Sequence, residues 1–428
     1  MSQFETLGLS PSVLKQVLAL GYDAPTPIQK EAIPLVLDGH DLMGLAQTGT
    51  GKTAAFGLPL VDRLREENGK PAPKTIRALI LAPTRELVNQ IAGNLRDFVR
   101  GTPIKVGSVV GGASINVQIK NLNRGTDILV ATPGRLLDLV ERRAVFLDTA
   151  KYLVLDEADQ MLDLGFIHAL RKIAKLVGTP RQTLLFSATM PKQMEELART
   201  YLNDPVRVEV APPGRTADKV RQSVHFVEQS DKAALLRDCL AETPEELSIV
   251  FSRTKHGAEK LMKTLVKHGF DAGSIHGNKS QGQRDRAIKA FRSGDIRVLV
   301  ATDVAARGID IPGVARVYNY DLPEVAESYV HRIGRTARAG AEGEAVAFCA
   351  PAEMSLLRGI ERLVGIGISV AGGEPWRGGH EDAPRGRKGG GRPRGEGRPQ
   401  RTGGRGKPQG QPDRNRRRSR PRRKPVAA

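Results

Sequence analysis

Short apolar runs followed by polar or glycine-rich clusters recur through the N-terminal half and constrain the fold more than any other feature. "DLMGLA" leads into "QTGTGKT" and "RALILA" into "PTREL", while "DILVA" precedes "TPGR", "YLVL" precedes "DEAD" and "TLLF" precedes "SATM". Apolar strands that alternate with helical patterns predict a parallel sheet with helices on both faces. Ligands of such sheets bind beyond the carboxyl ends of the strands, where all these clusters fall.

The same pattern restarts after a polar segment rich in Pro and Gly. "LSIVF" precedes "SRTK", "RVLVA" precedes "TDVAARG" and "RVYNY" precedes "DLPE". "ILVATPGR" and "VLVATDVAARG" also echo each other across that segment. We therefore predict an α/β fold with two similar domains, residues 1–210 and 219–370, joined by a linker at 211–218. The cleft between the domains is then available to a ligand.

The C-terminal segment, 371–428, carries 18 Arg and Lys against 5 Asp and Glu, and much of the chain's net charge of +19. It is rich in Gly and Pro and its one aromatic residue is Trp376. Such a segment buries too little apolar surface to offset chain entropy, so we predict a disordered tail. A basic tail favours nucleic acid as its partner. A solubilising tail or a membrane tether is the alternative, disfavoured by the lack of an apolar helical face.

The two cysteines, Cys239 and Cys349, have no metal-ligand spacing and form no disulfide framework. We therefore expect no structural metal and a reducing compartment. The N-terminal "MSQFETLGLSPSVLKQ" lacks a signal-peptide pattern, and no stretch is apolar enough to span a bilayer. These observations predict a cytoplasmic protein without a membrane partner.

"AQTGTGKT", which ends at Thr53, fits the phosphate-binding loop, with Ala46 in place of its usual first glycine. Gly49 and Gly51 let backbone N–H groups approach phosphate oxygens. Lys52 brings a cation to the β- and γ-phosphates, and the Thr53 hydroxyl can ligate Mg²⁺. The position between a strand and a helix strengthens the prediction, since the helix N-terminus attracts anions.

"VLDEAD" supplies two carboxylates at the end of a later strand. Asp156 stands where a nucleotide-hydrolysing enzyme holds Mg²⁺, and Glu157 could orient or deprotonate the attacking water. The alternative is a helix start, where carboxylates are common. The phosphate-binding loop upstream favours the catalytic interpretation.

In this order, "AQTGTGKT", "PTREL", "TPGR", "DEAD", "SAT", "ATDVAARGID" and "HRIGRTAR" closely resemble the motifs of the DEAD-box RNA helicases. "GYDAPTPIQ" resembles that family's Q motif, with Phe4 in the position of its isolated aromatic residue. The resemblance runs from about Phe4 to Ala350 and implies two tandem RecA-like domains. The short N-terminus, "AQTGTGKTAAF" and the basic tail look most like the bacterial RhlE-type subgroup.

The resemblance implies ATP and Mg²⁺ as cofactors. Gln29 is expected to hydrogen-bond the adenine edge, with Tyr22 or Phe4 packed on the ring. An amide matches adenine's adjacent donor and acceptor, which favours ATP over GTP. The further nucleotide contacts that the resemblance implies are Thr26, Gln47, Thr48, Gly49, Thr50, Gly51, Lys52 and Thr53, with Gly308 and Asp310 from the second domain.

In "HRIGRTARAG", Arg332, Arg335 and Arg338 recur every third residue, which on one helix places them along roughly one face. The resemblance assigns Arg335 and Arg338 to the γ-phosphate as arginine fingers that reach across from the second domain. The alternative is a solvated cationic face paired with local carboxylates. Ala337 replaces the glycine common at this point of the motif.

The resemblance implies that hydrolysis is coupled to unwinding by Ser187, Thr189 and His331, through the "DEAD" carboxylates. For Ser187 and Thr189, the plainer alternative is a hydroxyl-rich strand end.

Residues implied to contact RNA carry hydroxyl, amide or guanidinium groups, which suit phosphates and 2′-hydroxyls, and some of them are expected to be structural. They are Thr84, Arg85, Glu86, Gly111, Gly112, Thr132, Arg135, Ser252, Arg253, Gln281, Arg284, Thr302, Asp303 and Arg307.

Three functional hypotheses follow from the sequence. The first is an RNA-stimulated ATPase that separates short duplexes by closure of its two domains, with the tail tethering RNA electrostatically. The second is an ATP-gated RNA clamp or annealing chaperone with little net unwinding. The third is a DNA-translocating helicase, disfavoured by the DEAD motif together with the Q motif. Ribosomal precursors or RNA-decay proteins are further candidate partners.

Overall fold

The computed structural model describes residues 3–46, 49–67, 69–210, 220–306, 309, 311, 313–337 and 342–376. The predicted linker, 211–218, and the chain from Arg377 onward lie outside the described residues. We call residues 3–210 the first lobe and residues 220–376 the second lobe. No helix among the described residues is long and apolar enough to cross a membrane.

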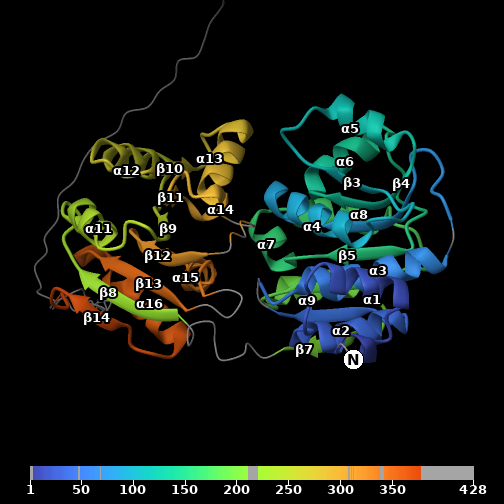
Figure 1. Cartoon of the computed structure of the whole chain (residues 1–428), viewed down its shortest axis with the longest axis horizontal. Helices are drawn as coiled ribbons and strands as arrows, with labels where there is room; N and C mark the ends of the chain where they lie inside the picture. The colour runs from blue at the N-terminus through green and yellow to red at the C-terminus, as the bar shows by residue number, and fades with distance from the viewer. Residues whose placement is uncertain are drawn as a thin grey trace, which may run out of the picture. The chain divides into compact units, whose positions relative to one another are not determined.

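A sheet of seven parallel strands forms the centre of the first lobe, in the order β3-β4-β2-β5-β6-β1-β7 (Figure 1). Its strands are β1 (Leu42–Leu45), β2 (Ile76–Leu81), β3 (Val106–Val109), β4 (Thr126–Ala131), β5 (Tyr152–Leu155), β6 (Gln182–Ser187) and β7 (Val206–Glu209). All the strands predicted for this half of the chain are present, and all five polar clusters follow their carboxyl ends.

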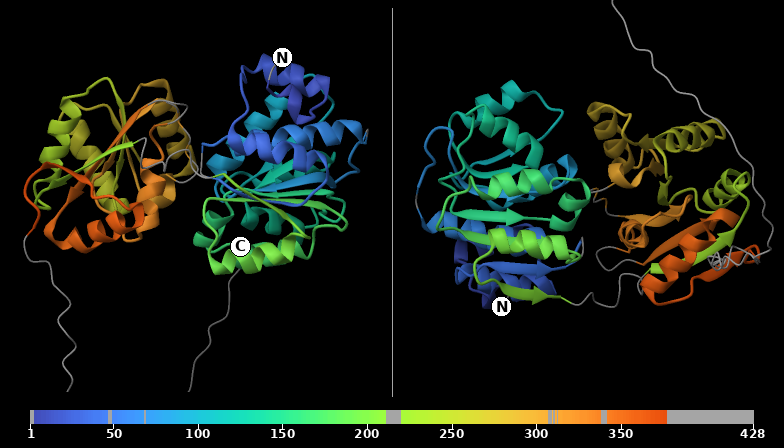
Figure 2. Two further views of the ribbon diagram at one scale, coloured as in Figure 1. Left: turned by 90° about the horizontal axis from the view of Figure 1, so that it is seen from below. Right: turned by 180° about the vertical axis from the view of Figure 1, so that it is seen from behind.

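Helices cover both faces of this sheet (Figure 2). Successive residues of β2 alternate between two cores: Ala78 and Ile80 pack in one, Leu79 and Leu81 in the other. The predicted double-sided packing is therefore confirmed. The helices are η1 (Glu5–Leu7), α1 (Pro11–Ala19), α2 (Pro27–Leu37), α3 (Lys52–Glu66), α4 (Arg85–Phe98), α5 (Ile115–Leu122), α6 (Pro133–Glu141), α7 (Ala158–Asp163), α8 (Ile167–Ala174) and α9 (Lys192–Tyr201).

The second lobe repeats this architecture, with the strand order β10-β11-β9-β12-β13-β8-β14. Counted from the first strand of each lobe, both sheets have the same order. Its strands are β8 (Val220–Phe226), β9 (Leu247–Phe251), β10 (Ala272–Ile275), β11 (Val298–Ala301), β12 (Val314–Asn319), β13 (Gly343–Cys349) and β14 (Ser369–Gly372). Its helices are α11 (Lys232–Ala241), α12 (Lys255–Lys267), α13 (Gln281–Ser293), α14 (Asp303–Ala306), α15 (Ala326–Ile333), η2 (Pro351–Glu353) and α16 (Met354–Val364).

The identical strand order explains the sequence echo across the linker. "ILVATPGR" contains the end of β4 and "VLVATDVAARG" contains β11, and each is the fourth strand of its lobe. Both segments occupy the same sheet position and run from a buried strand into a helix start. The echo therefore marks two equivalent strand-to-helix connections of a duplicated fold.

The second lobe extends past the boundary that we predicted at residue 370. β14 ends at Gly372, and the Trp376 indole packs against the core of the second lobe. Its Nε1 donates a hydrogen bond of 3.1 Å to the Cys349 carbonyl. Residues 371–376 therefore belong to the second lobe rather than to the basic tail, because the one aromatic side chain in this stretch is anchored.

A buried carboxylate, Glu353, ties together several elements of the second lobe. It accepts 2.5 Å and 2.6 Å contacts from the Lys232 Nζ and the Arg253 guanidinium. The backbone N–H groups of Leu322 and Ala350 also donate to it, each at 3.1 Å. Lys232 is fully buried. Since a buried charge is stable only when paired, this cluster specifies how α11, β9 and η2 meet.

We predict that Lys232→Met lowers the free energy of unfolding of the second lobe by about 3–5 kcal/mol, since it leaves Glu353 without its closest cation. Urea unfolding of the full chain, followed by the fluorescence of Trp376, measures this, because the chain has one Trp and it lies in this lobe. Lys263→Met is the control, because that exposed side chain makes a 3.7 Å surface pair with Glu259. Equal unfolding midpoints for the two variants would contradict the prediction.

Candidate active site

The phosphate-binding loop lies between β1 and α3, as predicted. Gly49 and Gly51 have left-handed backbone conformations, with φ of +82° and +90°. Lys52 is the first residue of α3, a helix of 15 residues. The loop therefore presents backbone N–H groups and the positive end of a helix at one place. Gln47 and Thr48 lie outside the described residues.

A cavity of about 170 Å³ adjoins this loop. Residues of the phosphate-binding loop, of the Q motif and of the DEAD motif line it together, and they are joined by one residue from the second lobe. The lining residues are Tyr22, Gln29, Gly49, Gly51, Lys52, Thr53, Ala54, Leu87, Gln90, Asn94, Asp156, Glu157 and Arg335. The structure thus brings together most of the predicted nucleotide contacts among its described residues.

Lys52 and Asp156 form the electrostatic centre of the cavity. The Lys52 Nζ lies 3.8 Å from Asp156 Oδ1 and donates to the Ala46 carbonyl at 3.1 Å. Burial raises the pKa of Asp156 to about 6, an effect that the nearby Lys52 cation opposes. A second cation at this carboxylate would stabilise its charged form further. Thr53 adds a hydroxyl to the same cavity, and this pair of hard oxygen ligands suits Mg²⁺.

Glu157 has an unusual backbone conformation at the start of α7. Its φ is +50°, which is rare for a residue other than glycine, and its side chain is buried. Its backbone N–H donates to Asp156 Oδ1 at 2.9 Å. The bend aims two successive carboxylates at one cavity, and backbone strain of this kind concentrates at functional sites.

Gln29 connects the Q motif to the phosphate-binding loop. Its Oε1 accepts from the Thr26 backbone N–H at 2.9 Å, and its Nε2 donates to the Gly51 carbonyl at 3.0 Å. One lone pair and one N–H of this amide remain for another partner. Tyr22 lines the cavity, whereas Phe4 is fully buried and packs edge-on against Tyr22, with ring centroids 6.2 Å apart. Phe4 therefore supports Tyr22 from behind.

The last carboxylate of the DEAD motif contacts the SAT motif directly. Asp159 Oδ2 accepts from the Thr189 backbone N–H at 2.9 Å and from its hydroxyl at 3.0 Å. The Ser187 hydroxyl donates to the Thr189 carbonyl at 2.6 Å. The predicted contact between these two motifs is therefore present within the first lobe. His331 lies on α15 of the second lobe.

Arg332 and Arg335 of "HRIGRTARAG" do not share a helix face. α15 ends at Ile333, so Arg335 lies in the turn that follows and lines the cavity. Arg332 is buried, and its guanidinium pairs with both oxygens of Asp303, at 2.5 and 2.8 Å. The predicted cationic stripe is therefore wrong for Arg332, whose charge a local carboxylate neutralises.

The remaining residues of this turn explain why the motif usually has a glycine. Ala337 has a φ of +54°, a conformation that glycine adopts without strain. The Arg335 Nη1 donates to the Ile309 carbonyl at 2.7 Å, which anchors the turn. Arg338, Gly308, Asp310 and Arg307 lie outside the described residues.

Several residues that we expected to bind RNA have partners within the protein. The Thr84 hydroxyl accepts from the Leu87 backbone N–H at the start of α4. Thr132 precedes α6, and its backbone N–H donates to the Val109 carbonyl at 3.1 Å. Further pairs are Glu86 with Gln281 and Arg284, at 3.2 and 3.0 Å, Arg135 with the Ala113 carbonyl, Ser252 and the Arg253 backbone with Asp321, the Thr302 backbone N–H with the Ile275 carbonyl, and Asp303 with Arg332. Their RNA contacts stay predictions.

Arg85 differs from these residues. Its guanidinium lies against Gly112, and its buried Nε has no hydrogen-bond partner among the described residues. Burial also lowers its pKa. A partly desolvated guanidinium next to the Gly111–Gly112 turn is suited to donate hydrogen bonds to a phosphate oxygen.

Three contributors to the site were missed in the sequence. Gln90 and Asn94 lie one turn apart on α4 and both line the cavity beside the phosphate-binding loop. Asp321, after β12, accepts from the Ser252 hydroxyl at 3.0 Å and from the Arg253 backbone at 2.9 Å. Spacing on α4 is the one signal that could have found the first two, because residues four apart share a helix face.

Two family profiles match the chain. The profile described as DEAD/DEAH box helicase matches residues 26–197, and the profile of the helicase conserved C-terminal domain matches 231–340. The ATP-dependent RNA helicase CshA of Listeria monocytogenes is 45% identical over 361 residues, which cover 84% of this chain and 68% of the relative. CshA of Limosilactobacillus reuteri is also 45% identical, over 84% of this chain and 72% of the relative.

Two solved structures with bound RNA are also similar to this chain. S. cerevisiae Dbp5 bound to RNA and ADP BeF3 is 33% identical, with a TM-score of 0.77, over 87% of this chain and 96% of that one. The DEAD-box helicase Mss116 bound to ssRNA and UDP-BeF is 28% identical, with a TM-score of 0.79, over 88% of this chain and 81% of that one.

We predict that Gly51→Ala weakens nucleotide binding about 10-fold or more. The new Cβ meets Gln29 Nε2 and Thr26 Oγ1, and left-handed backbone costs an alanine roughly 1–2 kcal/mol. Equilibrium titration of the full chain with a fluorescent ATP analogue measures this affinity. Gly359→Ala is the control, because its added Cβ meets no atom within 4 Å. The same affinity in both variants would refute the prediction.

Proposed function

The chain belongs to the DEAD/DEAH box helicase family and is an ATP-dependent RNA helicase, and we propose that it uses ATP hydrolysis to separate RNA strands locally by closure of its two lobes. The observation that carries this proposal is the composition of the nucleotide cavity. Arg335 from the second lobe lines it together with the phosphate-binding loop and two DEAD carboxylates of the first lobe.

In this proposal the first lobe binds ATP. Backbone N–H groups at Gly49 and Gly51, with the Lys52 cation, hold the phosphates. Thr53 and Asp156 would hold Mg²⁺, which, when bound, neutralises charge on the β- and γ-phosphate oxygens. Glu157 orients the attacking water and accepts its proton. The burial of both carboxylates excludes other water from the reaction.

The Q motif recognises the base. Gln29 has one acceptor and one donor position left after its bonds to Thr26 and Gly51, which is what the adenine edge requires. Tyr22 packs on the ring, and Phe4 holds Tyr22 in place. Because Gln29 also bonds the phosphate-binding loop, base recognition and phosphate binding are mechanically connected.

The second lobe completes the site with cations. Arg335 and Arg338 act as arginine fingers on the γ-phosphate, and Gly308 and Asp310 contact the phosphates and ribose. Such fingers are typically worth about 10³–10⁵ in rate. Closure is then favoured by nucleotide, since ATP interacts better with the closed form than with the open one. Hydrolysis of the γ-phosphate is coupled to the RNA-binding surface through the contact of Asp159 with Thr189 and the contact of Thr189 with Ser187, together with His331.

RNA is bound through its backbone. The proposed contacts are hydroxyl, amide and guanidinium groups, and aromatic residues make up 4% of the chain, so base stacking contributes little. On closure, one strand bends so that it no longer fits a duplex, and product release resets the lobes. The basic tail tethers RNA in a salt-dependent way.

Finer assignments rest on the sequence alone. The RhlE-type subgroup is suggested by the short N-terminus and the basic tail, whereas both relatives at 45% identity are named CshA. We also propose a cytoplasmic location and partners among ribosomal precursors or RNA-decay proteins. The division into a first domain that ends at residue 210 and a second that begins at residue 219 is part of the same proposal.

We predict that Glu157→Gln abolishes RNA-stimulated ATP turnover and duplex separation, with a loss in rate of about 10²–10⁴, while RNA and ATP still bind. Turnover and strand-displacement assays on a short RNA duplex measure both outputs. Glu196→Gln is the control, since Glu196 is exposed on α9.

Two results would contradict the proposal. Strand annealing or clamping that persists in Glu157→Gln as the chain's main output would favour the RNA clamp. ATPase stimulation by DNA as strong as that by RNA would favour a DNA-translocating helicase.

A further inference from the structure

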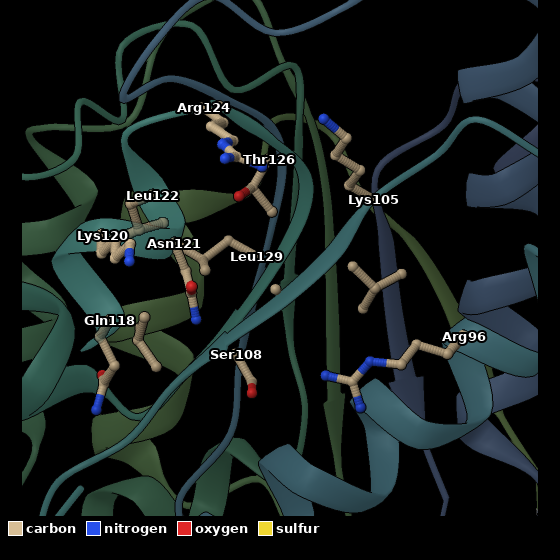
Figure 3. Close-up of a pocket in the computed structure, with 14 residues that line it drawn as sticks. Arg96, Lys105, Ser108, Gln118, Lys120, Asn121, Leu122, Arg124, Thr126 and Leu129 are labelled. Atoms are coloured by element: carbon tan, nitrogen blue, oxygen red, sulfur yellow. The ribbon is translucent and has the colours of Figure 1, made fainter. Parts of the chain in front are cut away.

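The first lobe has a second hollow, which shares no lining residue with the nucleotide cavity. It is a groove of about 440 Å³ over β3, one of the two edge strands of the first sheet. Residues of α4, β3, α5 and the turn before β4 line it. We call it the β3 groove. Figure 3 shows Lys120 and Arg124 on one side of the groove, with Lys105 and Arg96 on the other.

The β3 groove is strongly cationic. Arg96, Lys105, Lys120 and Arg124 line it, and no Asp or Glu does. All four side chains are exposed, and none of them forms an ion pair or a hydrogen bond within the described part of the chain. Four unpaired cations around one hollow repel each other, so an anion that contacts several of them is bound favourably.

Two carboxylates next to lining residues in the sequence, Asp127 and Asp97, already have partners. Asp127 pairs with Arg77 at 3.2 Å and accepts from the Lys105 backbone N–H at 2.8 Å. Asp97, beside Arg96 on α4, pairs with Arg100 at 2.8 Å. Neither carboxylate neutralises a side chain of the groove, so its positive charge is available to a ligand.

One end of the groove leads to the proposed RNA surface. Val109 lines the groove, and the Gly111–Gly112 turn begins two residues later in the chain. The buried Gln118 amide bonds both the N–H and the carbonyl of Val110, at 3.2 and 3.1 Å. These two hydrogen bonds hold the Gly111–Gly112 turn in a defined position relative to the groove.

The chemistry of the lining favours a phosphate backbone. Ser108 and Asn121 add a hydroxyl and an amide, and no aromatic side chain lines the groove, so it offers phosphate and sugar contacts without base stacking. An acidic peptide that added a strand to β3 is the competing occupant. β3 has four residues, which gives such a peptide a short ladder of hydrogen bonds.

We propose that the β3 groove binds the phosphates of an RNA segment that continues beyond the Gly111–Gly112 turn. This proposal rests on the RNA-binding surface proposed above. The groove then lengthens the RNA footprint of the first lobe and favours substrates with a single-stranded extension. Each phosphate neutralised on single-stranded RNA contributes about 0.7 to the slope of log affinity against log salt concentration.

The test compares two full-length variants. The first combines Arg96→Gln, Lys105→Gln, Lys120→Gln and Arg124→Gln. The matched control combines Lys260→Gln, Lys267→Gln, Arg358→Gln and Arg362→Gln, which removes the same charges from exposed positions of the second lobe. Fluorescence anisotropy measures their affinity for uridine oligonucleotides of about 10 and about 30 nucleotides over a salt series, lengths that fall within and beyond a typical single-domain site.

The groove variant is expected to bind the longer RNA about 10-fold more weakly than the control, with a salt slope smaller by roughly 2–3. Its affinity for the shorter RNA is expected to match the control. Equal affinities and slopes in both variants would overturn the proposal. Loss of binding to the shorter RNA in both variants would instead challenge the proposed RNA surface itself, so the two failures are distinguishable.

Crosslinking of the unmodified chain tests the same idea without relying on a variant that folds. RNA with 4-thiouridine near one end is expected to crosslink to the peptides that contain β3 and α5. Crosslinks confined to other peptides would overturn the proposal. A competition experiment in which polyglutamate binds the groove and the longer RNA fails to displace it would also overturn the proposal.

Discussion

Parallel pairing of the strands is the constraint on which the site depends. In each lobe every described strand pair is parallel, so all the strand-to-helix connections leave the sheet at one edge. The phosphate-binding loop, the DEAD motif and the SAT motif follow β1, β5 and β6, which are neighbours within the sheet or one strand apart. Residues more than a hundred positions apart therefore share one cavity without any long loop. The second lobe repeats the strand order, so its own connections gather in the same way.

Charges buried at these edges are compensated pair by pair. Lys52 balances Asp156 in the cavity of the first lobe, and in the second lobe Arg332 balances Asp303 and Lys232 balances Glu353. A buried charge is stable only with such a partner, so each pair also holds the elements that carry it in register. Arg335 is placed differently, because it lies in a turn and lines the cavity. Ala337, two residues later in the same turn, has a left-handed backbone conformation. The structure thus separates Arg332, which pairs with a carboxylate of its own lobe, from Arg335, which lines the cavity.

Much of this arrangement could be predicted from the sequence, because long apolar runs and glycine-rich motifs carry strong local signals. β3 and β7, the two edge strands of the first sheet, precede none of the five polar clusters and were missed. The partner of Arg332 could not be found from spacing, since Asp303 lies 29 positions away and meets it only through the fold. Gln90 and Asn94 belong to no motif, and they reach the cavity because α4 packs beside α3. Trp376 lies in a segment of tail-like composition, yet its ring is anchored by the core of the second lobe.

The claim at the centre of this account is that the first lobe begins the nucleotide site and Arg335 of the second lobe completes it. The most direct measurement is the steady-state ATP turnover of Arg335→Ala in saturating RNA, beside Arg358→Ala, which removes an exposed arginine from α16. The account predicts a fall in kcat of about 10³ or more for Arg335→Ala alone, with ATP still bound by the first lobe. An Arg335→Ala protein that turns over ATP as fast as the Arg358→Ala control would contradict it.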